Sequence, residues 1–112
     1  MTKIVFGRAP DGQLTFVDLL GHAGYADEGE DIVCAAVTSA IQFVHVLLDD
    51  VKGLVFDTEV EPVGTHIRLS FPPAVRGSVQ DTLEALRIHY HEMQENYAEF
   101  IQVTEVHSHA EN

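Results

Sequence analysis

Residues 31–48 read DIVCAAVTSAIQFVHVLL, an almost unbroken apolar stretch from which the fold can be worked out. Its apolar side chains recur at the spacing of one face of an α-helix, and Gly53 then breaks the pattern. Further apolar residues, among them Phe43, extend the hydrophobic surface around the helix. A helix this apolar should be buried on more than one side, which in a small protein predicts a homodimer interface through it. The predicted inner seam of this first helix comprises Val33, Val37, Ile41, Val44 and Leu48.

Short strands are expected on both sides of this helix. The first two flank Ala9-Pro10-Asp11-Gly12, a turn in which proline presets φ and glycine accepts a positive φ. The next two flank a second turn at Pro62-Val63-Gly64. Each pair therefore predicts an antiparallel hairpin. The expected strands, including one near the end of the chain, are residues 3–8, 14–20, 54–61, 65–71 and 100–106.

A second helix is predicted after the second hairpin. Ser78 opens a segment that resembles a capping box, with Asp81 in the place of Glu or Gln. The element order is then ββαββαβ. It predicts one domain over residues 1–112 with an α+β fold: two layers, a mostly antiparallel sheet of about five strands, and two helices on one face. The apolar seam of the second helix steps by three or four residues through Val79, Leu83, Leu86, Tyr90, Met93 and Tyr97.

The composition excludes several classes of protein. The chain of 112 residues has six Lys and Arg against eighteen Asp and Glu, a formal net charge of −12. Binding to nucleic acid or to an anionic membrane surface is disfavoured because both need clustered basic side chains, whereas basic partners are favoured. There is no signal-peptide pattern, and no apolar run reaches the ~18 residues of a membrane span. We therefore expect a cytoplasmic protein that does not associate with membranes.

The chain has a single cysteine, Cys34, so no intramolecular disulfide can form. It falls in the expected first turn of the first helix, twelve positions after His22 at the start of a glycine-bearing loop. A helix N-terminus stabilises a thiolate, and a nearby imidazole can protonate a leaving amine. The amides of Cys34 and Ala35 could help to bind an oxyanion. On spacing alone, a buried apolar cysteine and a structural histidine are the more common explanation.

Two motifs give the chain a recognisable pattern. Gly21-His22-Ala23, followed by Gly29-Glu30-Asp31-Ile32-Val33-Cys34-Ala35-Ala36, resembles the ribosomal-processing cysteine protease family, Prp. The resemblance covers nearly the whole chain. It implies a small bacterial cytoplasmic homodimer that removes a short N-terminal extension from a basic large-subunit ribosomal protein precursor, cutting after an aromatic residue. It also implies that Cys34 is the nucleophile and that His22 is the catalytic acid and base.

The same resemblance implies supporting roles for nearby residues. Gly21 and Asp31 match motif positions, and Asp31 either orients His22 or caps its own helix. Ala35 follows the nucleophile, and Thr38 stands where the family often has serine. The glycine-bearing loop is expected to be a mobile lid whose acids either meet a basic substrate or only keep the loop solvated. The lid comprises Ala23, Gly24, Tyr25, Ala26, Asp27, Glu28, Gly29 and Glu30.

We expect no metal and no other cofactor, although the chain has seven histidines. His89 and His91 point about 200° apart around the second helix, and no third ligand accompanies the pair His107 and His109, whereas zinc sites need three or four ligands. The alternative to a protease is a non-catalytic dimeric binding module for a basic ribosome-associated protein. Alkylation of Cys34 distinguishes the two, because a buried structural thiol would be inert.

Overall fold

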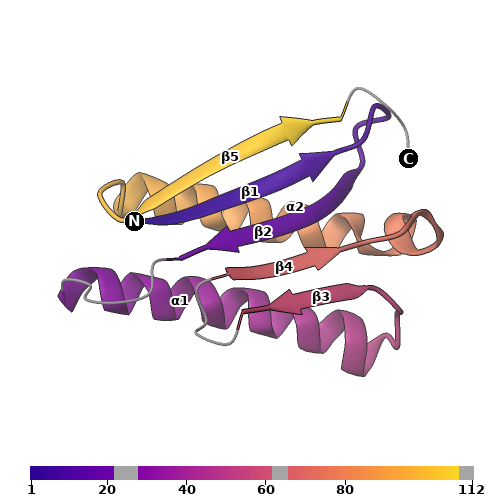
Figure 1. Cartoon of the computed structure of the whole chain (residues 1–112), viewed down its shortest axis with the longest axis horizontal. Coiled ribbons are helices and arrows are strands. Elements are labelled where there is room, and N and C mark those ends of the chain that lie inside the picture. Colours follow the sequence, from indigo (N-terminus) through magenta and orange to yellow (C-terminus); the bar gives the residue numbers. More distant parts are fainter. Residues whose placement is uncertain (22–27, 62–65, 109–112) are drawn as a thin grey trace.

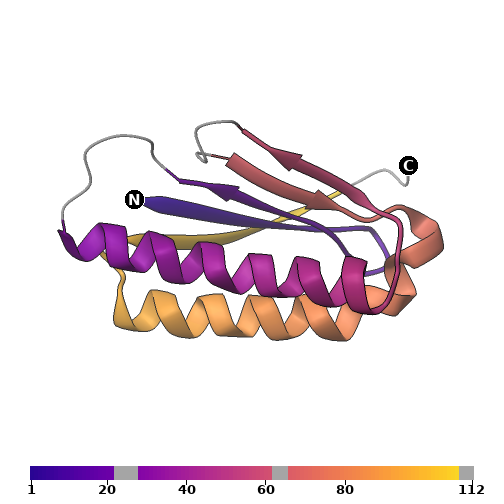
Figure 2. The ribbon, with the colours of Figure 1, turned by 90° about the horizontal axis from the view of Figure 1, so that it is seen from below.

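Two helices lie side by side on one face of a five-stranded sheet (Figures 1 and 2). The computed structural model describes residues 1–21, 28–61 and 66–108. The predicted α+β class, its two layers and its element order are confirmed. The elements are β1 (Thr2–Arg8), β2 (Leu14–Leu20), α1 (Glu28–His45), η1 (Val46–Val51), β3 (Asp57–Val60), β4 (His66–Ser70), α2 (Pro73–Asn96) and β5 (Ile101–His107).

The sheet has the strand order β3-β4-β2-β1-β5. Both predicted hairpins, β1–β2 and β3–β4, are antiparallel, and β2 also pairs with β4 in the antiparallel sense. Gly12 has a φ of 89° in the first turn, as predicted. β5 pairs with β1 in parallel, so that Thr2 lies opposite Ile101. This parallel pair brings two distant parts of the chain to one edge of the sheet.

A register shift in the first hairpin changes which side chains face the helices. The alternation of β2 predicts Leu14 on the same face as Phe16, but the pairing slips between Gly7 and Arg8. Leu14 is therefore fully buried together with Val17, while Phe16 is half-buried. A β-bulge of this kind places two residues opposite one and resets the alternation.

The side chains of β2 and β4 that face away from the helices form a polar cluster. The carboxylate of Asp18 contacts His66 Nε2 and accepts a hydrogen bond from the Arg68 guanidinium at 3.2 Å. The guanidinium of Arg68 also lies 4.1 Å from the centroid of the Phe16 ring. These contacts join neighbouring strands on the face of the sheet that α1 and α2 leave uncovered.

The first helix is longer than predicted at both ends. It begins at Glu28 rather than near Asp31, and a π-helical turn continues it to Val51 before Gly53, with a φ of 66°, ends it. Acidic residues at the start of a helix favour it through the helix dipole, which accounts for an extension into the acidic segment. The predicted seam is confirmed: Val33, Val37, Ile41, Val44 and Leu48 are all buried.

The outer side of α1 stays apolar in the single chain. Phe43 is 73% exposed and Ile32 is 67% exposed. Residues Asp31–Val51 form a helical stretch that is long and apolar enough to cross a membrane, so the expectation that no apolar run would reach this length is wrong. One such helix is weak evidence for a membrane, because the core helix of a soluble protein meets the same criterion.

The second helix starts earlier than its predicted capping box. Pro72 occupies the N-cap position and Pro73 the first helical position, where proline costs no hydrogen bond. Ser78 therefore lies inside the helix, and the capping-box prediction is wrong. The seam is confirmed for Val79, Leu83, Leu86 and Tyr90, which are buried against the sheet and α1. Met93 is half-buried, and the prediction is wrong for Tyr97, which is exposed just after the helix ends at Asn96.

Candidate active site

Cys34 lies on α1 where the helix passes the start of β1. Its side chain is half-buried, between the fully packed neighbours Val33 and Val37 on the helix seam. The Sγ atom lies 2.9 Å from the Thr2 Oγ1 atom, at hydrogen-bond distance. Thr2 itself is 3% exposed. The thiol thus has a polar partner on its inner side and remains partly open to solvent.

His22 lies outside the described residues, but the strands give the position from which its segment starts. β2 ends at Leu20, which pairs with Lys3 at the beginning of β1. The chain therefore leaves β2 at the end of the sheet where Thr2 meets Cys34. Figure 2 shows the end of β2, the start of β1 and the start of α1 at the same end of the molecule.

The start of α1 at Glu28 changes the expected chemistry of the helix terminus. Cys34 lies in the second turn rather than the first, and the stabilising effect of the dipole is concentrated in the first turn. The amides of Cys34 and Ala35 lie within the helix, where each bonds to the carbonyl four residues earlier. An oxyanion hole made of these two amides would need the helix to open at this point, and it stays a prediction.

The other predicted site residues are spread around the same end of the molecule. Gly21 is half-buried directly after β2, and Thr38 is half-buried one turn beyond Cys34. Asp31 is exposed within α1, three residues after its start, so it is not the N-cap. Ala35 is exposed.

Part of the predicted lid belongs to the helix. Glu28, Gly29 and Glu30 form the first turn of α1 rather than part of a loop, and the lid role stays a prediction. Residues 23–27 lie outside the described residues. A continuous helical backbone from residue 28 joins this turn directly to Cys34, whereas a lid would need a hinge between them.

Thr2 is the site residue that sequence reasoning missed. It precedes Cys34 by 32 positions and belongs to no motif. The parallel pairing of β1 with β5 sets its place, and pairing between distant strands leaves no local pattern in the sequence. The one available signal in the sequence was Thr2 itself, a small polar residue at a buried position of β1.

A second contact fixes α1 close to Cys34. The Tyr90 hydroxyl on α2 donates a hydrogen bond to the Val37 carbonyl at 2.7 Å. Burial raises the pKa of Tyr90, so the hydroxyl stays protonated and continues to donate. Val37 is three residues after Cys34, so this bond holds the turn of α1 that follows the thiol.

The other shifted pKa values belong to an ion cluster at the far end of β1 from Thr2. Arg8 donates to Glu105 at 2.7 Å and approaches Glu84 at 3.1 Å. The hydrogen bond to Glu105 raises the pKa of Arg8, and the same bond lowers the pKa of Glu105. Partial burial opposes ionisation of Glu84, but hydrogen bonds from Arg87 and Arg8 outweigh it and lower its pKa. This cluster joins β1, β5 and α2 and has no contact with Cys34.

Within residues 1–21, 28–61 and 66–108, no three His, Cys, Asp or Glu side chains gather into a group that could hold a metal ion. The chemistry available in the described part of the site is therefore that of a thiol with a hydroxyl partner.

Comparison with known proteins assigns the chain to a family of enzymes. The model of the family described as "Cysteine protease Prp" matches residues 1–102. The chain belongs to this family. The predicted family and the predicted class of enzyme, a cysteine protease, are thereby confirmed.

Individual relatives match nearly the whole chain. The ribosomal processing cysteine protease Prp of Bacillus subtilis (strain 168) is 25% identical, and the match covers 93% of this chain and 96% of that protein. The crystal structure of SMU.848 from Streptococcus mutans superposes with a TM-score of 0.85 at 26% identity, covering 96% of each chain. Prp from S. aureus, solved with a substrate peptide, has a TM-score of 0.86 at 20% identity, covering 95% of this chain and 100% of that one. The fold is thus that of solved Prp proteases.

Proposed function

We propose that this protease, acting as one domain over residues 1–112, removes the short N-terminal extension of a large-subunit bacterial ribosomal protein. The observation that carries the proposal is the position of Cys34. The only cysteine of a Prp-family chain lies half-exposed at the end of the sheet from which the His22 segment starts. The reaction takes place in the cytoplasm, where ribosomes are assembled.

The mechanism is nucleophilic acyl transfer. The Cys34 thiolate attacks the scissile carbonyl carbon, forming a C–S bond and placing negative charge on the carbonyl oxygen. The C–N bond then breaks as the His22 imidazolium gives its proton to the departing amine. His22 next takes a proton from water, which attacks the thioester. The C–S bond breaks, the carboxyl product leaves, and the thiolate is restored.

Two observations support a ribosomal substrate. The curated Bacillus subtilis relative is named as a ribosomal processing protease, and the S. aureus protein was solved with a substrate peptide and with a covalently linked product peptide. The net charge of −12 suits a basic protein, because opposite charge speeds encounter between partners.

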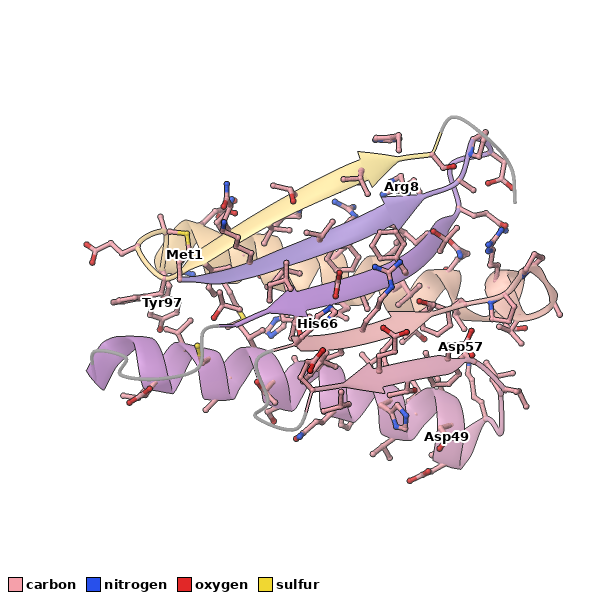
Figure 3. All side chains as sticks on the ribbon, in the orientation of Figure 1. Met1, Arg8, Asp49, Asp57, His66 and Tyr97 are labelled. Atoms are coloured by element: carbon pink, nitrogen blue, oxygen red, sulfur yellow. The ribbon has the colours of Figure 1, made fainter. Side chains whose placement is uncertain are left out.

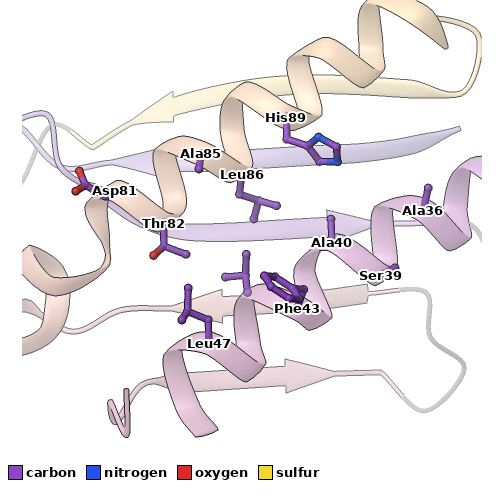
Figure 4. Close-up of a pocket in the computed structure, with 11 residues that line it drawn as sticks. Ala36, Ser39, Ala40, Phe43, Leu47, Asp81, Thr82, Ala85, Leu86 and His89 are labelled. Atoms are coloured by element: carbon purple, nitrogen blue, oxygen red, sulfur yellow. The ribbon is translucent and has the colours of Figure 1, made fainter. Parts of the chain in front are cut away.

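The outer side of α1 supports a homodimer through this helix. Phe43 stands 73% exposed beside a groove between α1 and α2 (Figure 4). Exposed apolar surface of this kind commonly marks a site of protein association. A second copy would cover Phe43, and its own Phe43 would be covered in turn. The groove is lined by Ala36, Ser39, Ala40, Phe43, Val44, Leu47, Asp81, Thr82, Ala85, Leu86 and His89.

The proposal is tested with a peptide spanning the junction between the extension and the mature ribosomal protein of the same organism. Mass spectrometry should find one cut at the junction with the wild-type protein, and none with Cys34→Ala or His22→Ala. Circular dichroism should show that both variants fold. Retained cleavage by Cys34→Ala would refute the mechanism. An intact peptide with the wild-type protein, together with tight binding, would support a binding module instead.

A further inference from the structure

The Thr2 hydroxyl is a buried polar group directed at the Cys34 thiol. Its oxygen lies 2.9 Å from Sγ, and the residue is 3% exposed while Cys34 is half-buried. Leaving a buried hydroxyl without a partner is unfavourable, so the contact with sulfur satisfies a group that water cannot reach. This contact therefore restricts the position of the Cys34 sulfur as well as that of the Thr2 hydroxyl.

Thr2 is held by the sheet and not by the helix that carries the thiol. Its amide donates to the Phe100 carbonyl at 2.8 Å, and the residue lies opposite Ile101 in the parallel β1–β5 pair. Figure 3 shows the start of β1 beside the turn between α2 and β5, where Met1 and Tyr97 are labelled. Threonine is β-branched and therefore stiff about χ1. Its hydroxyl is thus fixed relative to the sheet.

We propose that Thr2 is a positioning residue for Cys34. Its hydroxyl donates a hydrogen bond to the thiolate and holds Sγ in one orientation at the open side of the site. The contribution to peptide cleavage rests on the proposed function, whereas the effect on the thiolate itself does not.

The direction of the hydrogen bond follows from the charge on sulfur. A hydroxyl can donate or accept, but a thiolate has no proton, so Thr2 must be the donor once Cys34 ionises. Hydrogen bonds to an ionised acceptor are about twice as strong as neutral ones. Thr2 therefore favours the thiolate over the thiol. It also lowers the intrinsic nucleophilicity of the sulfur, because a better stabilised thiolate attacks more slowly.

These two effects predict a profile that a structural role alone would not give. Without the hydroxyl, alkylation by iodoacetamide should slow about fivefold near neutral pH, where fewer molecules hold a thiolate. At alkaline pH, where the thiolate is fully formed, the same variant should react at least as fast as the wild type. The two rate profiles should therefore cross as the pH rises.

The variants are chosen to separate the hydroxyl from the shape of the side chain. Thr2→Val removes the hydroxyl at nearly constant volume, and Thr2→Ser keeps the hydroxyl but loses the methyl group. Thr104→Val is the matched control, because Thr104 is an exposed threonine on the neighbouring strand β5. Since Cys34 is the only cysteine, the rate of alkylation reports on it alone.

Alkylation rates are measured on the whole chain across the pH range without substrate, and cleavage of the junction peptide is measured separately. In the alkylation assay, we expect the crossing profile for Thr2→Val and rates within about twofold of the wild type for Thr2→Ser and Thr104→Val. In the cleavage assay, we expect the kcat of Thr2→Val to be about fivefold lower at unchanged KM. If Thr2→Val does not fold, Thr2→Ala and Thr2→Ser replace it, and their profiles should differ in the same way.

A Thr2→Val profile that superimposes on the wild type overturns the proposal, as does an equal loss in Thr104→Val. A crossing profile in a protein that does not cleave the peptide would refute the proposed function and leave the positioning of Cys34 by Thr2 intact. Cleavage of the peptide together with superimposed alkylation profiles would support the proposed function and overturn the positioning of Cys34 by Thr2.

Discussion

The two helices lie on the same face of the sheet but differ in what they present to solvent. α2 buries one seam and turns a mostly polar surface outwards, as expected of a helix that only covers a core. α1 buries its seam as completely, yet carries the exposed Phe43 on its outer side and Cys34 near its beginning. In the proposed function, α2 therefore supports the fold, whereas α1 also carries the reacting group and a surface for a partner.

The largest expected effect tests whether α1 carries the reacting group. Cys34→Ser should lower the rate of peptide cleavage by about a thousandfold or more, because a hydroxyl is a far weaker nucleophile than a thiolate at this site. Ser78→Ala on α2 is the control and should cleave at the wild-type rate. If Cys34→Ser cleaved the peptide about as fast as the wild type in the same assay, Cys34 would not be the nucleophile and α1 would not carry the reacting group.

The next effect concerns the outer surfaces. Phe43→Glu should weaken self-association at least about thirtyfold, because a charge would then be buried in an apolar interface. Sedimentation velocity at low micromolar concentration measures this. The control is Ile88→Glu, which alters a half-exposed apolar residue of α2 and should leave the dimer intact. A wild-type chain that sediments as a monomer would contradict the assignment of a partner surface to α1.

A smaller effect is expected where the two helices meet. Tyr90→Phe removes the hydrogen bond to the Val37 carbonyl and should lower the free energy of unfolding by about 1 kcal/mol. Urea denaturation should show a lower midpoint at unchanged slope. Tyr97→Phe, at a half-exposed tyrosine, should change the midpoint very little. Equal losses in the two variants would argue that the bond to α1 adds no stability.

The smallest effect is a pH dependence from the ion cluster on α2 and β5. Because the hydrogen bond from Arg8 lowers the pKa of Glu105 in the folded state, its stabilisation is complete above the ordinary carboxyl pKa. It is lost as the pH falls through the lowered value. The contribution of such an ion pair is about 1 kcal/mol or less. The free energy of unfolding should therefore fall less steeply with acidification in Glu105→Gln than in the wild type, and parallel curves would contradict this.

Local patterns predicted most of the fold. The seams of both helices follow from spacing alone, because an apolar stripe at helical period has to be buried. Gly12 and Gly53 marked their turns because glycine tolerates a positive φ. The helix starts were harder to predict: Asp31 and Ser78 both resemble caps, yet the acidic segment and the Pro72-Pro73 pair begin their helices earlier.

The candidate site was only partly predictable. Cys34 followed from its uniqueness and its motif, and the motif also proposed His22. The Thr2 contact could not be predicted, because it depends on which strand pairs with β1, and strand pairing across most of the chain leaves no local trace. The β-bulge at Gly7 escaped prediction for a related reason, since register belongs to two strands together.

The parallel pairing of β1 with β5 also sets when the site is completed during synthesis. β1 is made before β5, the strand that pairs with its edge. A nascent chain that has released α1 already holds the thiol, yet lacks the strand that pairs with Thr2. The pairing that holds Thr2 beside Cys34 can therefore form only after translation has passed β5.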